Sequence, residues 1–174
     1  MSDLYERVVS QQDALKKLIA KLPGFKGYFI RTDRRSADKL LRESIADKFQ
    51  AQWQRLSSIQ RDLISAGNLD VLDDIEIGAI RLRQFIDRVK TAAYGYGGFF
   101  DAIKIKEDEL EKIYQYDLTL MEMADEIAAA IDNLEASIGS DGFPAAVRNV
   151  NQKAQDCLDA FNLRSELFKF GQES

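Results

Sequence analysis

Residues 72–93 read LDDIEIGAIRLRQFIDRVKTAA, and this stretch decides the fold class. Its apolar positions are spaced alternately by three and four residues: Leu72, Ile75, Ala79, Leu82, Ile86, Val89 and Ala93. This spacing places all of these side chains on one face of an α-helix, as in helical bundles and coiled coils. The stretch therefore predicts a helix that packs against partner helices. Gly78, the only glycine inside a predicted helix, is expected to let a neighbouring helix approach closely.

Similar periodicity continues along the chain, between clusters of glycine and proline. Helices are predicted near residues 3–21, 33–66, 70–93, 105–138 and 144–169. Asn68 and Asp70 are candidate caps between the second and third of these helices. Long helices joined by short connections run antiparallel to each other. The predicted fold is all-α, an elongated up-down antiparallel bundle of about five helices, with residues 1–174 forming a single domain.

The composition excludes several chemistries. The chain has 174 residues, a net charge of −5, no histidine and one cysteine, Cys157. Without histidine there is no Ser-His-Asp triad and no His-containing zinc site, and one cysteine cannot form an internal disulfide. We therefore expect no cofactor and no metal, and an enzyme is disfavoured. The absence of a long apolar run and of a signal-peptide pattern favours a cytoplasmic location.

Two charged residues interrupt the apolar seams of the last two predicted helices. The seam of helix 105–138 ends at Ile138 and contains Asp117, and the seam of helix 144–169 contains Arg164. Counting outward from the turn between these helices places Asp117 and Arg164 at the same level. The preferred interpretation is a structural ion pair that fixes helix register, because no third catalytic group converges there.

An aromatic and glycine pattern occurs twice, as GFKGYF at residues 24–29 and GYGGFF at residues 95–100. The helices before these loops also align, which predicts a pseudo-repeat of two hairpins, 1–66 and 70–138, followed by helix 144–169. In an up-down bundle both loops fall at the same end. Their rings either close the core at that end or form an exposed binding surface.

Charge is divided unevenly between the two halves of the chain. Residues 16–42 contain nine basic and two acidic residues, whereas residues 101–141 contain twelve acidic residues and three lysines. The basic residues near the start of helix 33–66 oppose its dipole and need a partner. That partner is either the acidic stretch 107–109 of the same chain or an external anion.

The function expected from these patterns is a non-enzymatic interaction or scaffold module that binds a protein partner, or assembles with itself, through its aromatic and basic end. The candidate binding residues are Lys26, Tyr28, Phe29, Arg31, Arg34, Arg35, Lys39, Tyr96, Phe99 and Phe100. One alternative is a peripheral protein that binds anionic lipid at the inner face of a membrane through the same end. The other is a small subunit of a nucleoprotein complex that contacts phosphates.

Overall fold

The described part of the chain consists of helices and the turns that join them. The computed structural model describes residues 13–22, 24, 26–27, 34–92 and 107–170, with side chains left aside at residues 13, 34–38, 107–111, 113 and 164–170. The helices are α2 (Asp13–Lys21), α4 (Arg34–Ser65), α5 (Leu72–Thr91), α6 (Glu107–Ala136) and α7 (Phe143–Phe170). The predicted all-α class is confirmed, and the ends of the four long helices agree with the prediction to within two residues.

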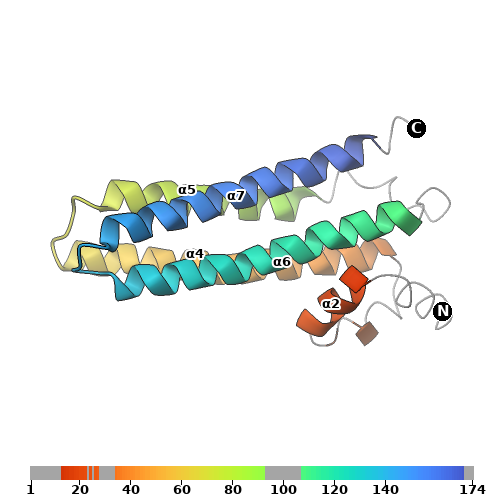
Figure 1. Ribbon diagram of the computed structural model, residues 1–174, viewed down its shortest axis with the longest axis horizontal. Helices are drawn as coiled ribbons and strands as arrows, with labels where there is room; N and C mark the ends of the chain where they lie inside the picture. Colours follow the sequence, from red (N-terminus) through yellow and green to blue (C-terminus); the bar gives the residue numbers. More distant parts are fainter. Residues whose placement is uncertain (1–12, 23, 25, 28–33, 93–106, 171–174) are drawn as a thin grey trace.

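The four long helices form an elongated bundle and alternate in direction along the chain (Figure 1). α4 packs against α5 and α6, α7 packs against the same two helices, and α2 packs against α6. Each long helix therefore has one antiparallel neighbour across a short turn and one parallel neighbour. α5 and α6 lie diagonally opposite each other, an arrangement that the longer connection between them permits.

The antiparallel pairs are joined by compact turns at one end of the bundle. After α4, Gly67 has a φ of 78°, and the amide of Asn68 donates to the carbonyl of Leu63 at 2.9 Å. This is the hydrogen-bond pattern by which a left-handed glycine ends a helix. The residue that caps the start of α5 is Val71, without a side-chain hydrogen bond. The predicted capping roles of Asn68 and Asp70 are therefore wrong, because the chain begins α5 directly from the preceding turn.

Aromatic side chains fill the middle of the core. The rings of Phe49 and Phe85 have centroids 4.4 Å apart, and Phe85 meets Phe161 edge-on with centroids 6.2 Å apart. These contacts join α4, α5 and α7 in one buried cluster. Tilted and edge-on ring pairs add to the stability gained by burial alone. Phe85 widens the apolar face of α5 beyond the seam that its spacing predicts.

Candidate functional site

The predicted binding surface at the end that carries α2 is only partly within the described residues. Lys26 is exposed, and so is Lys39, whose ammonium lies 3.8 Å from the carboxylate of Glu43 one turn later. Arg34 and Arg35 form the first turn of α4, but their side chains are outside the description. The remaining predicted residues lie outside the described part of the chain: Tyr28, Phe29, Arg31, Tyr96, Phe99 and Phe100. The aromatic part of the predicted surface therefore stays a prediction.

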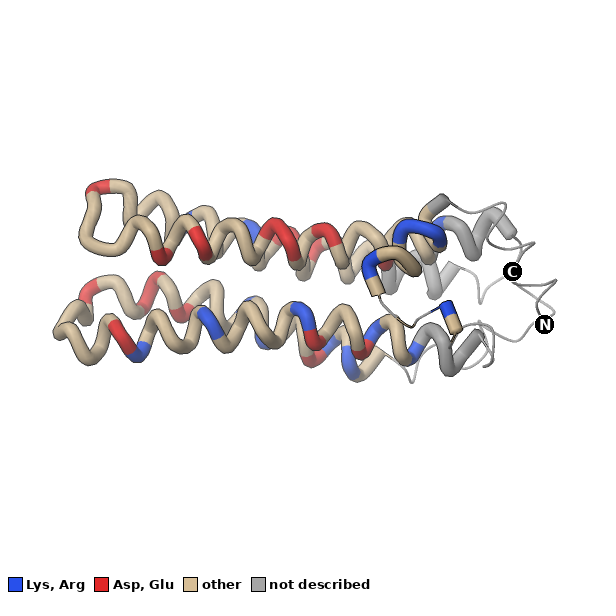
Figure 2. Tube along the Cα trace, turned by 90° about the horizontal axis from the view of Figure 1, so that it is seen from below, with Lys and Arg blue, Asp and Glu red and all other residues tan. Residues whose placement is uncertain are grey.

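Helix α2 adds exposed positive charge to this end, which we call the basic end (residues 13–27 and 34–42). Lys16 and Lys17 of α2 are exposed, and Figure 2 shows basic positions along this short helix. Neither forms an ion pair with another residue that the structure describes. The inner face of α2 buries Leu15 and Leu18 in the core, so α2 is held against the bundle while its two lysines face solvent.

Many of the acidic residues of α6 are neutralised by the helices around it. The carboxylate of Asp125 lies 3.3 Å from the ammonium of Lys21 on α2 and 3.9 Å from that of Lys48 on α4. On the other side, the ammonium of Lys153 on α7 donates to Glu126 at 2.7 Å, and this hydrogen bond raises the pKa of Lys153. The structural partnership between basic and acidic segments thus includes the middle of α6. The predicted contact with residues 107–109 involves side chains outside the description.

Arg55 of α4 makes the most extensive of these bridges. Its guanidinium contacts the carboxylates of Asp132 and Glu135 and donates to the backbone carbonyl of Ala128 at 3.4 Å. Burial by itself lowers the pKa of Arg55, but the contacts with the two carboxylates outweigh it and raise that pKa. These contacts fix the register of the parallel helices α4 and α6.

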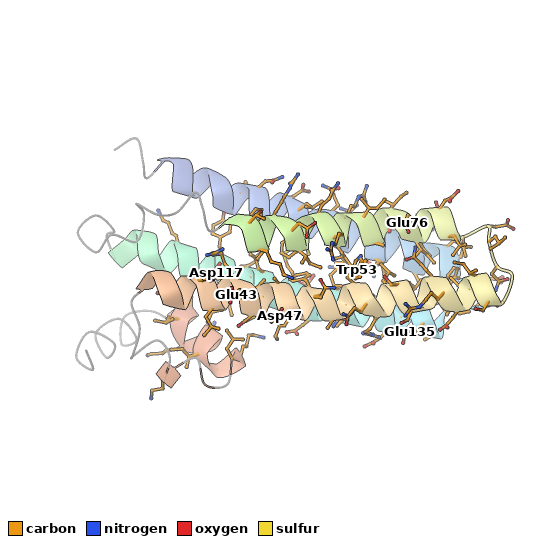
Figure 3. All side chains as sticks on the ribbon, turned by 180° about the vertical axis from the view of Figure 1, so that it is seen from behind. Glu43, Asp47, Trp53, Glu76, Asp117 and Glu135 are labelled. Carbon is orange, nitrogen blue, oxygen red and sulfur yellow. The ribbon has the colours of Figure 1, made fainter. Side chains whose placement is uncertain are left out.

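Two charged side chains are buried near the basic end. Asp117 on α6 is fully buried (Figure 3), as its seam position predicts. Its predicted partner Arg164 lies in α7, but the Arg164 side chain is outside the description, so the pairing stays a prediction. The sequence analysis missed Arg42, which is 5% exposed. The guanidinium of Arg42 donates to the carbonyl of Val89 at 3.4 Å. This carbonyl lies at the C-terminal end of α5, where the helix dipole stabilises a positive charge.

The opposite end of the bundle contains a pocket that the sequence analysis also missed. We define the turn end as residues 63–72 and 136–144, where the two compact turns meet. Its pocket has a volume of about 300 Å³, and its lining includes Leu63, Asp70, Val71, Ile138, Phe143 and Pro144. Ile138 is 43% exposed. Its predicted place in the α6 seam is wrong, because α6 ends at Ala136 and leaves Ile138 in the turn.

Chemical groups suited to catalysis do not converge in the described residues. No cluster of three or more histidine, cysteine, aspartate or glutamate residues there could hold a metal ion. Cys157 is buried in α7, and burial raises the pKa of its thiol to about 12. A thiol that stays protonated at neutral pH is a poor nucleophile. The described helices also lack a segment long and apolar enough to cross a membrane.

Comparison with known protein families, with characterised proteins and with solved structures finds no match to this chain. Two surfaces stand out at opposite ends of the bundle: the exposed lysines of the basic end and the apolar pocket of the turn end.

Proposed function

We propose that this protein is a non-enzymatic helical module that binds a protein partner through its basic end. The observation that carries the proposal is the pair of exposed lysines on α2, Lys16 and Lys17, which form no ion pair with the acidic side chains of α6 that the structure describes. Neighbouring lysines are already paired within the molecule, as Lys21 is with Asp125. A charged side chain that forms no ion pair within the molecule is available to a partner. Complementary charge on the partner raises the rate of association and its specificity.

The rigidity of the α2 surface supports this proposal. Leu15 and Leu18 are fully buried beneath the lysines, so the backbone of α2 is fixed on the bundle. Positions held by a packed helix lose little conformational entropy when a partner binds. A partner with an acidic surface fits this end best. Anionic lipid and nucleic acid also carry negative charge. They are the two alternatives that the experiment must distinguish from a protein partner.

The experiment places a photo-crosslinking amino acid at Ala20, an exposed position of α2, in the cell that makes the protein. Crosslinked proteins are identified by mass spectrometry, and the partner is purified and titrated with the full chain by fluorescence anisotropy. We expect Lys16→Glu/Lys17→Glu to weaken binding by about tenfold or more, because like charges then face each other. The matched control, Arg83→Glu/Lys153→Glu, changes the net charge equally in the middle of α5 and α7, away from both ends, and should leave binding unchanged.

The alternatives are tested in parallel with the same variants. Flotation with phosphatidylcholine vesicles, with and without phosphatidylserine, tests the membrane alternative. Titration of duplex DNA and single-stranded RNA across salt concentrations tests phosphate contact, because such binding must weaken steeply with salt. Lysine-dependent flotation or nucleic-acid binding, with no crosslinked protein at Ala20, would replace the proposal with the corresponding alternative.

A further inference from the structure

The pocket of the turn end is suited to an apolar side chain. The apolar part of its lining consists of Leu63, Val71, Ile138, Phe143 and Pro144. Leu69 and Ile64, on the α4–α5 side of the same end, are more than half exposed. Exposed apolar side chains that gather around a concave site indicate a contact with another molecule.

The surface around this pocket is acidic. Residues 61–74 contain one arginine and four aspartates, and residues 132–148 contain one arginine and three acidic residues. Because Arg55 pairs with Asp132 and Glu135 of the second segment, the two segments and Arg55 together carry a charge of −4. Asp70 contributes to the lining of the pocket itself. An occupant that carries positive charge is therefore favoured at this site.

This chain carries the complementary chemistry at its other end. The basic end exposes Lys16 and Lys17. They belong to a stretch, residues 16–42, that holds nine basic residues against two acidic ones, of which Lys21 and Lys39 are paired with Asp125 and Glu43. α2 lies beside α6, on the half of the bundle away from the two turns, so one molecule can use both surfaces at the same time (Figures 1 and 2).

From this arrangement we infer that the turn-end pocket binds the basic end of a second copy of this chain. The inference rests on the proposed function and names the partner of the basic end as the protein itself. Because the two contacting surfaces differ, the contact is heterologous, and repeating it adds copies end to end in an open chain. The acidic and basic surfaces attract across a short distance, so the association weakens as salt screens them.

The experiment is sedimentation velocity of the purified full chain over a range of concentrations at low and high salt. We expect concentration-dependent growth beyond a dimer at low salt and a monomer at high salt. Ile138→Asp in the pocket and Lys16→Glu/Lys17→Glu on α2 should each weaken self-association by about tenfold or more. The control is Ile77→Asp, because Ile77 on α5 is 42% exposed, as Ile138 is 43% exposed, but lies outside both ends. It should self-associate like the unchanged protein.

A mixing experiment distinguishes head-to-tail contact from other modes. Ile138→Asp retains an intact basic end, and Lys16→Glu/Lys17→Glu retains an intact pocket. Each variant alone should be monomeric, while an equal mixture should form dimers and nothing larger, since only one productive contact exists between them. Circular dichroism of every variant checks that the helices remain folded.

Several outcomes would overturn the inference. A monomer at every concentration and salt, self-association that survives both end variants, or a mixture that stays monomeric each contradicts head-to-tail contact. If the Ala20 crosslink instead identifies a different protein whose binding depends on Lys16 and Lys17, the proposed function stands and the self-assembly inference fails. If neither self-association nor a protein crosslink depends on these lysines, both fail.

Discussion

Gly78 lies buried where α5 and α7 run side by side, and the structure leaves no room there for a methyl group. A Cβ at Gly78 would clash with Oδ1 of Asn151, whereas the next side chain, Val150, would be 3.5 Å away. Asn151 is held in place because its Nδ2 donates to the carbonyl of Asp74 at 2.8 Å and its own carbonyl accepts from Arg81 at 3.0 Å. The close helix approach predicted from this glycine is confirmed.

The effect of Gly78→Ala on stability follows from opposing contributions. Alanine in a helix interior is favoured over glycine by about 1 kcal/mol. The clash with Asn151 costs about 1–3 kcal/mol as overpacking, and moving Asn151 breaks its hydrogen bond to Asp74, worth about 1 kcal/mol. We therefore expect Gly78→Ala to lower the free energy of unfolding by about 1–3 kcal/mol.

Removing the obstruction should reverse the sign of this effect. In an Asn151→Ala background, the nearest remaining contact of the new methyl group is Val150 at an ordinary van der Waals distance. Gly78→Ala should then raise the free energy of unfolding by about 1 kcal/mol, the helix preference alone. The coupling between the two substitutions is thus about 2–4 kcal/mol, well above the few tenths expected of independent sites.

Urea denaturation of the four proteins of this cycle, followed by far-ultraviolet circular dichroism, measures each free energy of unfolding. Equal m-values across the series show that the substitutions act on stability and not on the extent of unfolding. If Gly78→Ala stabilises the protein equally with and without Asn151, the two residues are not coupled and the reasoning is refuted.

Three further predictions concern other parts of the bundle. Cys157 should react with a thiol reagent such as DTNB only after unfolding. The free energy of unfolding should fall above about pH 9, by ~1.4 kcal/mol per pH unit, because the pKa of the folded thiol is raised to about 12 and only the unfolded thiol loses its proton. Cys157→Ala should remove this part of the pH dependence. Arg42→Met should lower the free energy of unfolding by about 1–3 kcal/mol in urea denaturation, since a charged hydrogen bond to Val89 is lost, and an unchanged value would contradict its bridging role. Arg55→Ala should cost about 1 kcal/mol at low salt and less at high salt, because its bridge to Asp132 and Glu135 is partly exposed.

Much of the fold follows from the sequence because burial in a helical bundle is periodic. In α5, the three-and-four spacing identifies Ile75, Leu82 and Val89 as core residues, and all are buried. The same rule fails where an amphipathic side chain meets the core edge. Trp53 is only half-buried, midway along the bundle (Figure 3), and stacks with the guanidinium of Arg83 at 5.4 Å from the ring centroid.

The candidate site was less predictable because it depends on contacts between distant segments. Positive charge in residues 16–42 is visible in the sequence. Only the packed structure shows that Lys21 pairs with Asp125, whereas Lys16 and Lys17 form no ion pair with a described residue. The turn-end pocket is formed by two turns separated by about one hairpin length of chain. Ile138 gives a signal in hindsight, since it directly precedes the helix-ending Gly139 and so falls beyond the last buried turn of α6.

The pairing of parallel neighbours has a consequence for how the chain folds. Hydrogen bonds between the hairpin α4–α5 and the hairpin α6–α7 join residues far apart in sequence, with separations of 70 for Arg81 and Asn151 and 77 for Arg55 and Asp132. Folding slows as contacting residues become more distant along the chain. Within each hairpin, contacts can form quickly outward from the turn because the residues are close in sequence. We therefore expect docking of the two hairpins to be the rate-determining step. This protein should therefore fold more slowly than a helical bundle of equal length in which the neighbouring helices follow one another in sequence.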